Sequence, residues 1–106
     1  MPFIDVSTVP GRPTVPGFVG RFIHGERQTI AVWEIAAGSA SPVHQHPHEQ
    51  TITVLSGQFE LTMEGQTRVL VPGLMALVPS NVPHGGRALT DCRMLDTFAP
   101  VREDYR

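Results

Sequence analysis

Glycine and proline interrupt this chain so often that no long helix fits between them. The 106 residues include 10 Gly and 10 Pro, and no stretch of about ten residues combines helical periodicity with freedom from both. Short β-rich segments lie between these turn-forming residues at spacings of roughly 8–12 residues, as in sandwiches and closed barrels. The chain is therefore expected to be all-β, and its length suits a single domain with one core.

Six segments have the β-rich or alternating pattern of strands. The expected strands are residues 28–36, 51–55, 58–63, 66–71, 74–78 and 92–98. A turn is expected at 38–42. The segment 1–27, rich in Pro and Gly, is expected to form an N-terminal arm or edge strands, and residues 28–106 the barrel. A partly disordered tail is the alternative for the first residues.

Composition excludes several classes of partner and site. The net charge is −2 and the eight Lys and Arg residues form no basic run, so nucleic acid is not an expected partner. A single cysteine, Cys92, excludes a disulfide within the chain and the cysteine-based zinc motifs. Neither a signal-peptide pattern nor an apolar stretch of membrane-spanning length is visible. A soluble cytoplasmic protein without a membrane partner is expected.

Three histidines stand close together in the segment His44-Gln-His46-Pro-His48. In an extended chain, residues two apart point to the same side, so His44 and His46 direct their imidazoles to one point, and Gln50 has the same parity. Imidazole nitrogens and an amide oxygen suit ions such as Zn, Fe, Ni, Cu or Mn, and without thiolates the site is expected to be open and exchangeable. The alternative is a His-rich surface loop without metal.

The remaining histidines carry weaker signals. Pro47 disturbs the extended path before His48, which is expected to be a surface residue or a neighbour of the ligands. His24 is expected in a turn. His84, after Pro-Ser-Asn-Val-Pro, is by itself more typical of a structural turn than of a ligand.

Two motifs resemble those of the cupin family. In the first, Gly38, His44, His46, Gln50 and Gly57 have the family's spacing, although Gln50 stands where many cupins carry Glu. The stretch that resembles the family runs from about residue 28 to residue 102. It implies a cupin double-stranded β-helix, also called a jelly-roll barrel.

The second cupin motif is matched at Pro72, Pro79, Asn81 and His84, with Asn81 in place of a usual Gly. Ala88 stands where the family has a last Asn. The resemblance implies one divalent metal ion, which could be Ni, Zn, Fe or Mn. It implies as the ligands of that ion His44, His46, Gln50 and His84.

One subgroup of the family is more similar than the rest. The string from His44 to Gln50, the tripeptide Pro83-His-Gly85 and the segment 95–105 are similar to the KdgF-type small cupins. Members of this subgroup open unsaturated monouronates from pectin and alginate into linear keto sugars. The resemblance implies a metal-dependent isomerase or hydro-lyase-like enzyme. Its implied catalytic residues are Asp96, Phe98 and Arg102.

The pattern of the last strand is compatible with these roles. Met94, Asp96 and Phe98 share one parity, so an inward Asp96 would be desolvated near the metal and suited to acid–base chemistry. In the alternative, Leu95 points inward and Asp96 is exposed. Arg102 could clamp a substrate carboxylate through its planar fork, or it could pair at the surface with the acidic residues that follow it.

The expected function is metal-dependent action on a small carbohydrate-type substrate, most specifically the opening of unsaturated monouronates. The alternatives are a dioxygenase with a redox metal and a non-catalytic module that binds a small metabolite. The resemblance to small cupins also implies a homodimer, to which apolar side chains near the N-terminus would contribute. The same side chains could instead close the bottom of a monomeric barrel.

Overall fold

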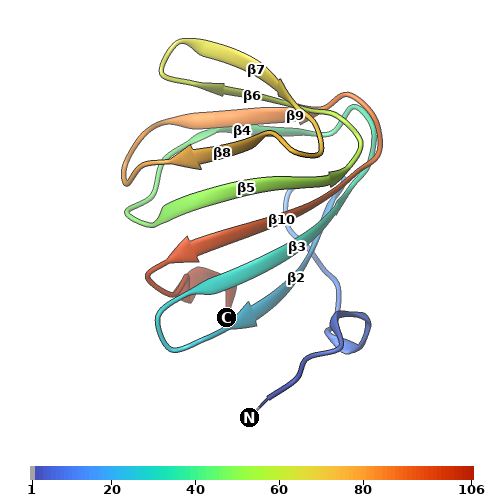
Figure 1. Cartoon of the computed structure of the whole chain (residues 1–106), viewed down its shortest axis with the longest axis vertical. Coiled ribbons are helices and arrows are strands. Elements are labelled where there is room, and N and C mark those ends of the chain that lie inside the picture. The colour runs from blue at the N-terminus through green and yellow to red at the C-terminus, as the bar shows by residue number, and fades with distance from the viewer. Residues whose placement is uncertain (1) are drawn as a thin grey trace.

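Ten strands in two antiparallel sheets form most of the computed structural model, which describes residues 2–106 (Figure 1). Met1, the first residue of the expected arm, lies outside the described residues. The strands are β1 (Arg12–Pro13), β2 (Phe18–His24), β3 (Thr29–Ile35), β4 (Ala40–His44), β5 (Glu49–Ser56), β6 (Phe59–Met63), β7 (Gln66–Leu70), β8 (Met75–Val78), β9 (His84–Ala88) and β10 (Cys92–Ala99). Two short 3-10 helices, η1 (Val6–Thr8) and η2 (Glu103–Tyr105), lie near the ends of the chain.

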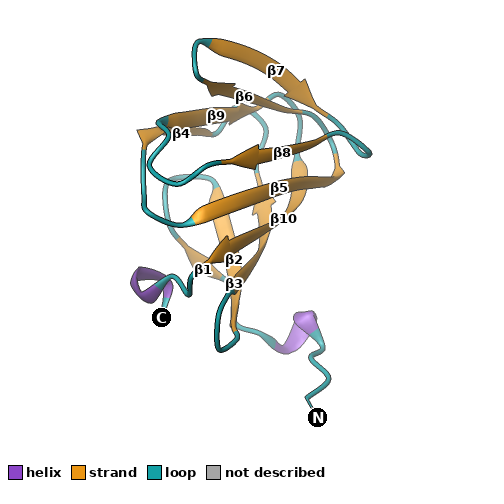
Figure 2. Cartoon of the chain, turned by 60° about the vertical axis from the view of Figure 1, so that its left-hand side comes forward, coloured by secondary structure: helices purple, strands orange, loops and turns teal. Residues whose placement is uncertain are grey.

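The sheets contain six and four strands, in the orders β1-β2-β3-β10-β5-β8 and β4-β9-β6-β7. Figures 1 and 2 show them facing each other as the two walls of one barrel, with the N-terminal segment extending away from it. No α-helix occurs among residues 2–106. The predicted all-β, single-domain jelly-roll barrel is confirmed.

Three segments differ from the sequence-based expectation. Residues 40–44 form β4 where a turn was predicted, because an edge strand tolerates Pro42, whose missing N–H breaks no ladder inside the sheet. Residues 84–88 form β9, a strand that the Gly-Gly pair concealed. His24 is the last residue of β2 rather than a turn residue. Its ring bonds to the Thr29 hydroxyl at 2.9 Å and to the Tyr105 carbonyl at 3.2 Å.

Strand register stacks the inward side chains in layers. On β10, Asp96 lies opposite Ala31 of β3 on one side and Ile52 of β5 on the other. Toward one end of the barrel, the next inward pair is Phe98 and Gln50. Toward the other end, the inward side chains of the paired strands are apolar. The apolar end is filled by buried residues that include Trp33, Ile35, Val54, Phe59 and Met94. The polar end of the core is therefore where a site can form.

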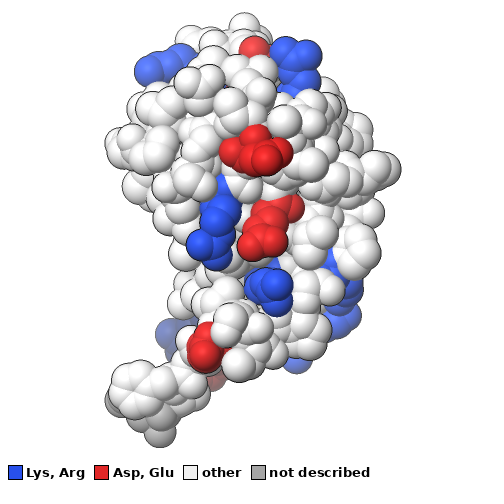
Figure 3. Space-filling view, turned by 90° about the vertical axis from the view of Figure 1, so that its right-hand side faces the viewer, with Lys and Arg blue, Asp and Glu red and all other residues white. Residues whose placement is uncertain are grey.

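Charged side chains are dispersed over the surface. Figure 3 shows acidic and basic groups intermixed on one face of the molecule. Two cross-strand ion pairs, Arg87–Glu60 at 3.6 Å and Arg93–Glu34 at 3.9 Å, lie at the surface in contact with solvent, so each contributes little to stability. The fold thus depends on its apolar core and its strand pairing rather than on surface charge.

Gly57 closes the turn between β5 and β6 with a φ of 90°. A Cβ atom at this position would collide with the carbonyl oxygen of Asp91 and lie 2.8 Å from the Thr90 hydroxyl oxygen. Gly65, in the β6–β7 turn, also has a positive φ, 74°, but a Cβ there would meet nothing within 4 Å.

These two glycines make a matched test of local packing. We expect Gly57→Ala to lower the free energy of unfolding by about 3 kcal/mol, because strain from φ adds to a steric collision. Gly65→Ala should cost about 1 kcal/mol, from φ alone. Urea unfolding of both variants measures the difference, and equal losses would contradict the packing described at Gly57.

Candidate metal centre and its cavity

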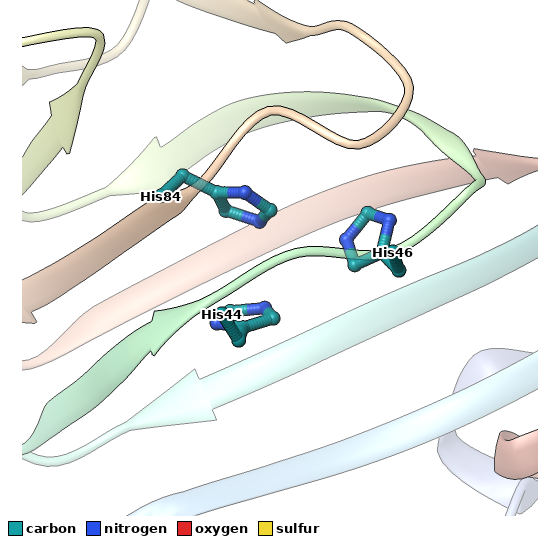
Figure 4. Close-up of side chains that lie close together, drawn as sticks. All are labelled: His44, His46 and His84. Atoms are coloured by element: carbon teal, nitrogen blue, oxygen red, sulfur yellow. The ribbon is translucent and has the colours of Figure 1, made fainter.

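Three histidines converge at the polar end of the barrel (Figure 4). His44 ends β4, His84 begins β9, and the two residues pair directly across these strands. His46 follows in the connection to β5. One ring nitrogen from each residue lies within 4.8 Å of the others, close enough for all three to bind one ion. The predicted convergence of His44 and His46 is thus found, and strand pairing adds His84.

Local hydrogen bonds fix the orientation of each imidazole ring and determine which ring nitrogen is free to bind a metal. In all three histidines Nδ1 lies 2.8 to 2.9 Å from a main-chain carbonyl two residues away, at Pro42, His48 and Val82. Because a carbonyl only accepts, Nδ1 carries the proton and Nε2 keeps its lone pair. Such bonds are typical of metal-bound histidine. His48 contributes its carbonyl to this arrangement.

Gln50 supplies an oxygen as the fourth donor, and its hydrogen bonds test whether a cation fits. Its Oε1 lies 3.0 Å from His46 Nε2, and its Nε2 donates to Asp96 Oδ2 at 2.9 Å. With the amide held in that direction, two lone pairs face each other, which is unfavourable unless a cation shares them. The buried Nε2 of His84 also has no hydrogen-bond partner among residues 2–106. The donor set therefore fits a divalent metal ion.

The environment favours the neutral form of His46 and of His84. Burial is the largest cause that lowers the pKa of both His46 and His84, and the charge of Arg102 lowers both further. Hydrogen bonds to the His48 and Val82 carbonyls act in the opposite direction. A neutral imidazole is the form that binds metal, so the site is prepared for an ion at neutral pH.

Asp96 points into the barrel, which excludes the exposed alternative. Only 4% of the residue is accessible, and Oδ1 has no hydrogen-bond partner among residues 2–106. Burial raises the pKa of Asp96 to about 7. The hydrogen bond from Gln50, the side chain of Trp33 and the charge of Arg102 each act in the opposite direction and lower this pKa. A carboxyl group that titrates near neutral pH can both give and take a proton.

Arg102 combines both placements that the sequence allowed. Its guanidinium pairs with Asp104 through Nε at 3.1 Å and Nη2 at 2.7 Å, yet the residue is only 8% exposed and lines the cavity. The expected pairing with a following acidic residue is found, and it lies at the rim of the cavity rather than on the open surface, because the rings of Phe98 and Tyr105 cover the guanidinium. Phe98 is fully buried, with its ring centroid 5.8 Å from that of His46.

These side chains line one cavity of about 350 Å³. Its polar lining includes His44, Gln50, His84, Asp96 and Arg102, and its apolar lining includes Trp33, Phe59, Leu61, Met94 and Tyr105. A volume of this size suits a small molecule. Sequence patterns did not single out Trp33 or Tyr105. Trp33 could have been predicted from its inward parity on β3. Tyr105 could not, because the short C-terminal turn that contains it has no periodic pattern.

Comparison with known proteins places the chain in a family. Residues 31–98 match the cupin-domain model, and the chain belongs to the cupin family. It is similar to the pectin degradation protein KdgF of Dickeya dadantii, at 36% identity over 72 residues that cover 66% of each protein. The structure of KdgF from a Halomonas species superimposes with a TM-score of 0.93 at 29% identity, covering 99% of this chain and 100% of that one. The predicted resemblance is confirmed.

More distant similarity extends to other cupins. The quercetin 2,3-dioxygenase of Bacillus subtilis is 39% identical over 64 residues, which are 59% of this chain but 19% of that enzyme. The dimethylsulfoniopropionate lyase DddQ of Ruegeria pomeroyi is 44% identical over 52 residues, 26% of its length. The matches thus span less than two thirds of these curated relatives. Within the described part of the chain, no helix has the length and apolar character needed to cross a membrane.

The raised pKa of Asp96 predicts a distinctive dependence of stability on pH. Since the folded value of about 7 exceeds the ordinary 3.8, Asp96 stabilises the fold fully below pH 4, and this contribution is lost as the pH rises through 7. The two values differ by roughly three pH units, which corresponds to a loss on the order of 4 kcal/mol.

We expect metal-free wild type to lose stability between pH 4 and 8 relative to metal-free Asp96→Asn, which cannot ionise. His46 and His84 act in the opposite direction but are present in both proteins, so the difference isolates Asp96. Urea unfolding across this pH range measures it. A difference that does not change with pH would contradict the burial of an ionisable Asp96.

Proposed function

We propose that this protein opens the ring of unsaturated monouronates in a metal-dependent isomerisation. The observation that carries the proposal is the placement of His44, His84, Asp96 and Arg102 around one small cavity, with His46 beside them as the third histidine of the cluster. The similarity to a pectin degradation protein supports the substrate class, because unsaturated uronates are the acidic sugars that pectin breakdown yields.

The proposed metal site uses the four donors that the sequence indicated. His44, His46, Gln50 and His84 would hold one divalent ion, and their borderline donor set suits Ni, Zn, Fe or Mn. When bound, this ion supplies Lewis acidity that polarises substrate oxygens. Because the reaction is an isomerisation, a metal without redox activity suffices.

Three side chains have separate roles in the proposed reaction. Arg102 donates hydrogen bonds to the substrate carboxylate and orients the ring. Asp96, held at Oδ2 by Gln50, takes a proton at its unpartnered Oδ1 from the anomeric hydroxyl as the ring C–O bond breaks. The bond electrons stay on the ring oxygen, which leaves as an enolate, and the anomeric carbon becomes an aldehyde. The proton held by Asp96 then passes to the alkene carbon beside the enolate carbon, which turns the enolate into a ketone, so atoms and electrons balance without an oxidant. Phe98 shields this region from water.

Activity and oxygen uptake separate this proposal from its alternatives. Purified protein with bound Ni or Zn should abolish the ultraviolet absorbance of unsaturated galacturonate and consume no oxygen. Asp96→Asn should lower kcat at least 100-fold, the scale of a lost acid–base group. Asp91→Asn is the matched control, because Asp91 accepts from the Ala37 N–H and lies outside the cavity lining.

Two results would overturn the proposed reaction. Oxygen uptake with bound iron would indicate a dioxygenase. Binding of the sugar without any change in absorbance would indicate a binding module. Retention of full activity in Asp96→Asn would remove the proton-transfer role assigned to Asp96.

We further propose a homodimer in which the N-terminal segment contacts a second copy. Phe3 is 94% exposed and Ile4 51% exposed, on a segment that extends away from the barrel (Figures 1 and 2). Apolar side chains placed in this way gain stability when a partner covers them. Light scattering should give two chains for wild type and one chain for the double variant Phe3→Ser, Ile4→Ser. A monomeric wild type would exclude the dimer.

A further inference from the structure

Arg102 is held in the cavity wall by a carboxylate, two aromatic rings and a main-chain bond. We infer that Asp104, the residue that supplies the carboxylate, is a positioning residue that determines how this site recognises an acidic ligand. The inference rests on the proposed function, since it concerns the same cavity and the same class of acidic sugar.

Contacts on several sides fix the guanidinium. Asp104 accepts from Nε through Oδ1 at 3.1 Å and from Nη2 through Oδ2 at 2.7 Å. The guanidinium carbon lies 4.0 Å from the ring centroid of Tyr105 and 4.9 Å from that of Phe98. The Arg102 main-chain N–H donates to the Thr29 hydroxyl at 2.8 Å, so the backbone is fixed as well.

This arrangement changes which part of Arg102 is available. Nε and Nη2 form the flat edge of the fork that usually grips a carboxylate, and Asp104 occupies both. Among residues 2–106 the side-chain hydrogen bonds of Arg102 run through Nε and Nη2 and none through Nη1, and Arg102 lines the cavity. A bound carboxylate therefore meets the terminal Nη1–Nη2 end of the guanidinium, where three N–H groups remain, rather than the Nε–Nη2 edge.

Asp104 also balances the charge of Arg102. The Arg102 side chain is 10% exposed, whereas that of Asp104 is 57% exposed, so the ion pair runs from the cavity wall to the rim. The guanidinium lines the same cavity as His44, His84 and Asp96, so a ligand in that cavity can reach both Arg102 and the proposed metal centre. Without Asp104 a largely buried guanidinium loses its counter-charge, and rotamers directed toward water become favoured.

Two sugars and two variants test this role in the intact, metal-loaded protein. Galacturonate and galactose share a ring but differ at the carboxylate, so the ratio of their affinities reports recognition of that group alone. Asp104→Asn removes the negative charge of the Arg102–Asp104 pair. Glu103→Gln is the matched control from the same turn, because among residues 2–106 Glu103 forms its ion pair with Arg106, at 3.2 Å, and does not line the cavity.

We expect wild type and Glu103→Gln to prefer galacturonate, and Asp104→Asn to bind it at least fivefold more weakly with unchanged affinity for galactose. The Nε–H resonance of Arg102, protected from exchange by Asp104 in wild type, should exchange rapidly in Asp104→Asn. A purely structural role for Asp104 would weaken both sugars equally.

Equal or tighter binding of galacturonate by Asp104→Asn would overturn the positioning role, and so would a wild type that shows no preference for galacturonate. Turnover of unsaturated galacturonate, measured on the same samples, separates this inference from the proposed reaction. A wild type without turnover whose carboxylate preference depends on Asp104 would overturn the reaction and support the positioning role.

Discussion

The side-chain amide of Gln50 joins two polar centres that the barrel would otherwise bury separately. Its oxygen faces His46 and its nitrogen donates to Asp96, so one residue fixes both a lone pair at the metal centre and the orientation of a carboxyl group. A glutamate at this position could offer only acceptor oxygens when ionised, and would set two carboxylates against each other. The amide therefore couples the metal centre and Asp96 without adding negative charge to the core.

Strand register places Gln50, Asp96 and the histidines at the same end of the barrel. Because β10 lies between β3 and β5, Asp96 and Phe98 face inward in the layers that Ile52 and Gln50 occupy on β5. Pairing of β4 with β9 sets His44 opposite His84. Each ring is then locked by a carbonyl from its own loop, a short-range contact that needs no further long-range packing. The site thus combines long-range register with local hydrogen bonds.

The sequence predicts the parts of this site that depend on local periodicity. Parity within an extended segment predicted that His44 and His46 converge, and parity on the last strand offered the inward Asp96. Gln50 follows a bend at residues 47–48, so the pairing of β5 rather than unbroken parity places it. His84 could not be placed from residues alone, because its partner is forty positions away and β9 carries a Gly-Gly pair. The structure explains that pair: a Cβ on Gly86 would collide with the ring of Phe59, and a Cβ on Gly85 would lie 3.1 Å from the Ser41 carbonyl oxygen, so both positions favour glycine despite its low β-propensity. The positioning role proposed for Asp104 could not be predicted from the sequence either, because a short terminal turn has no periodic pattern that indicates where a side chain points.

The barrel separates the stabilising and functional parts of its core. Trp33, Ile35, Val54 and Phe59 fill one end with apolar side chains, while Asp96, Arg102 and two histidines are buried toward the other. Burial of those polar groups opposes folding where they lack partners, as the unpartnered Asp96 Oδ1 and His84 Nε2 show. A ligand that binds only the folded chain at this end adds its binding free energy to the free energy of unfolding. Metal binding is therefore expected to stabilise the same half of the barrel that the functional groups destabilise, so that the site and the fold are energetically linked through the donors of one ion.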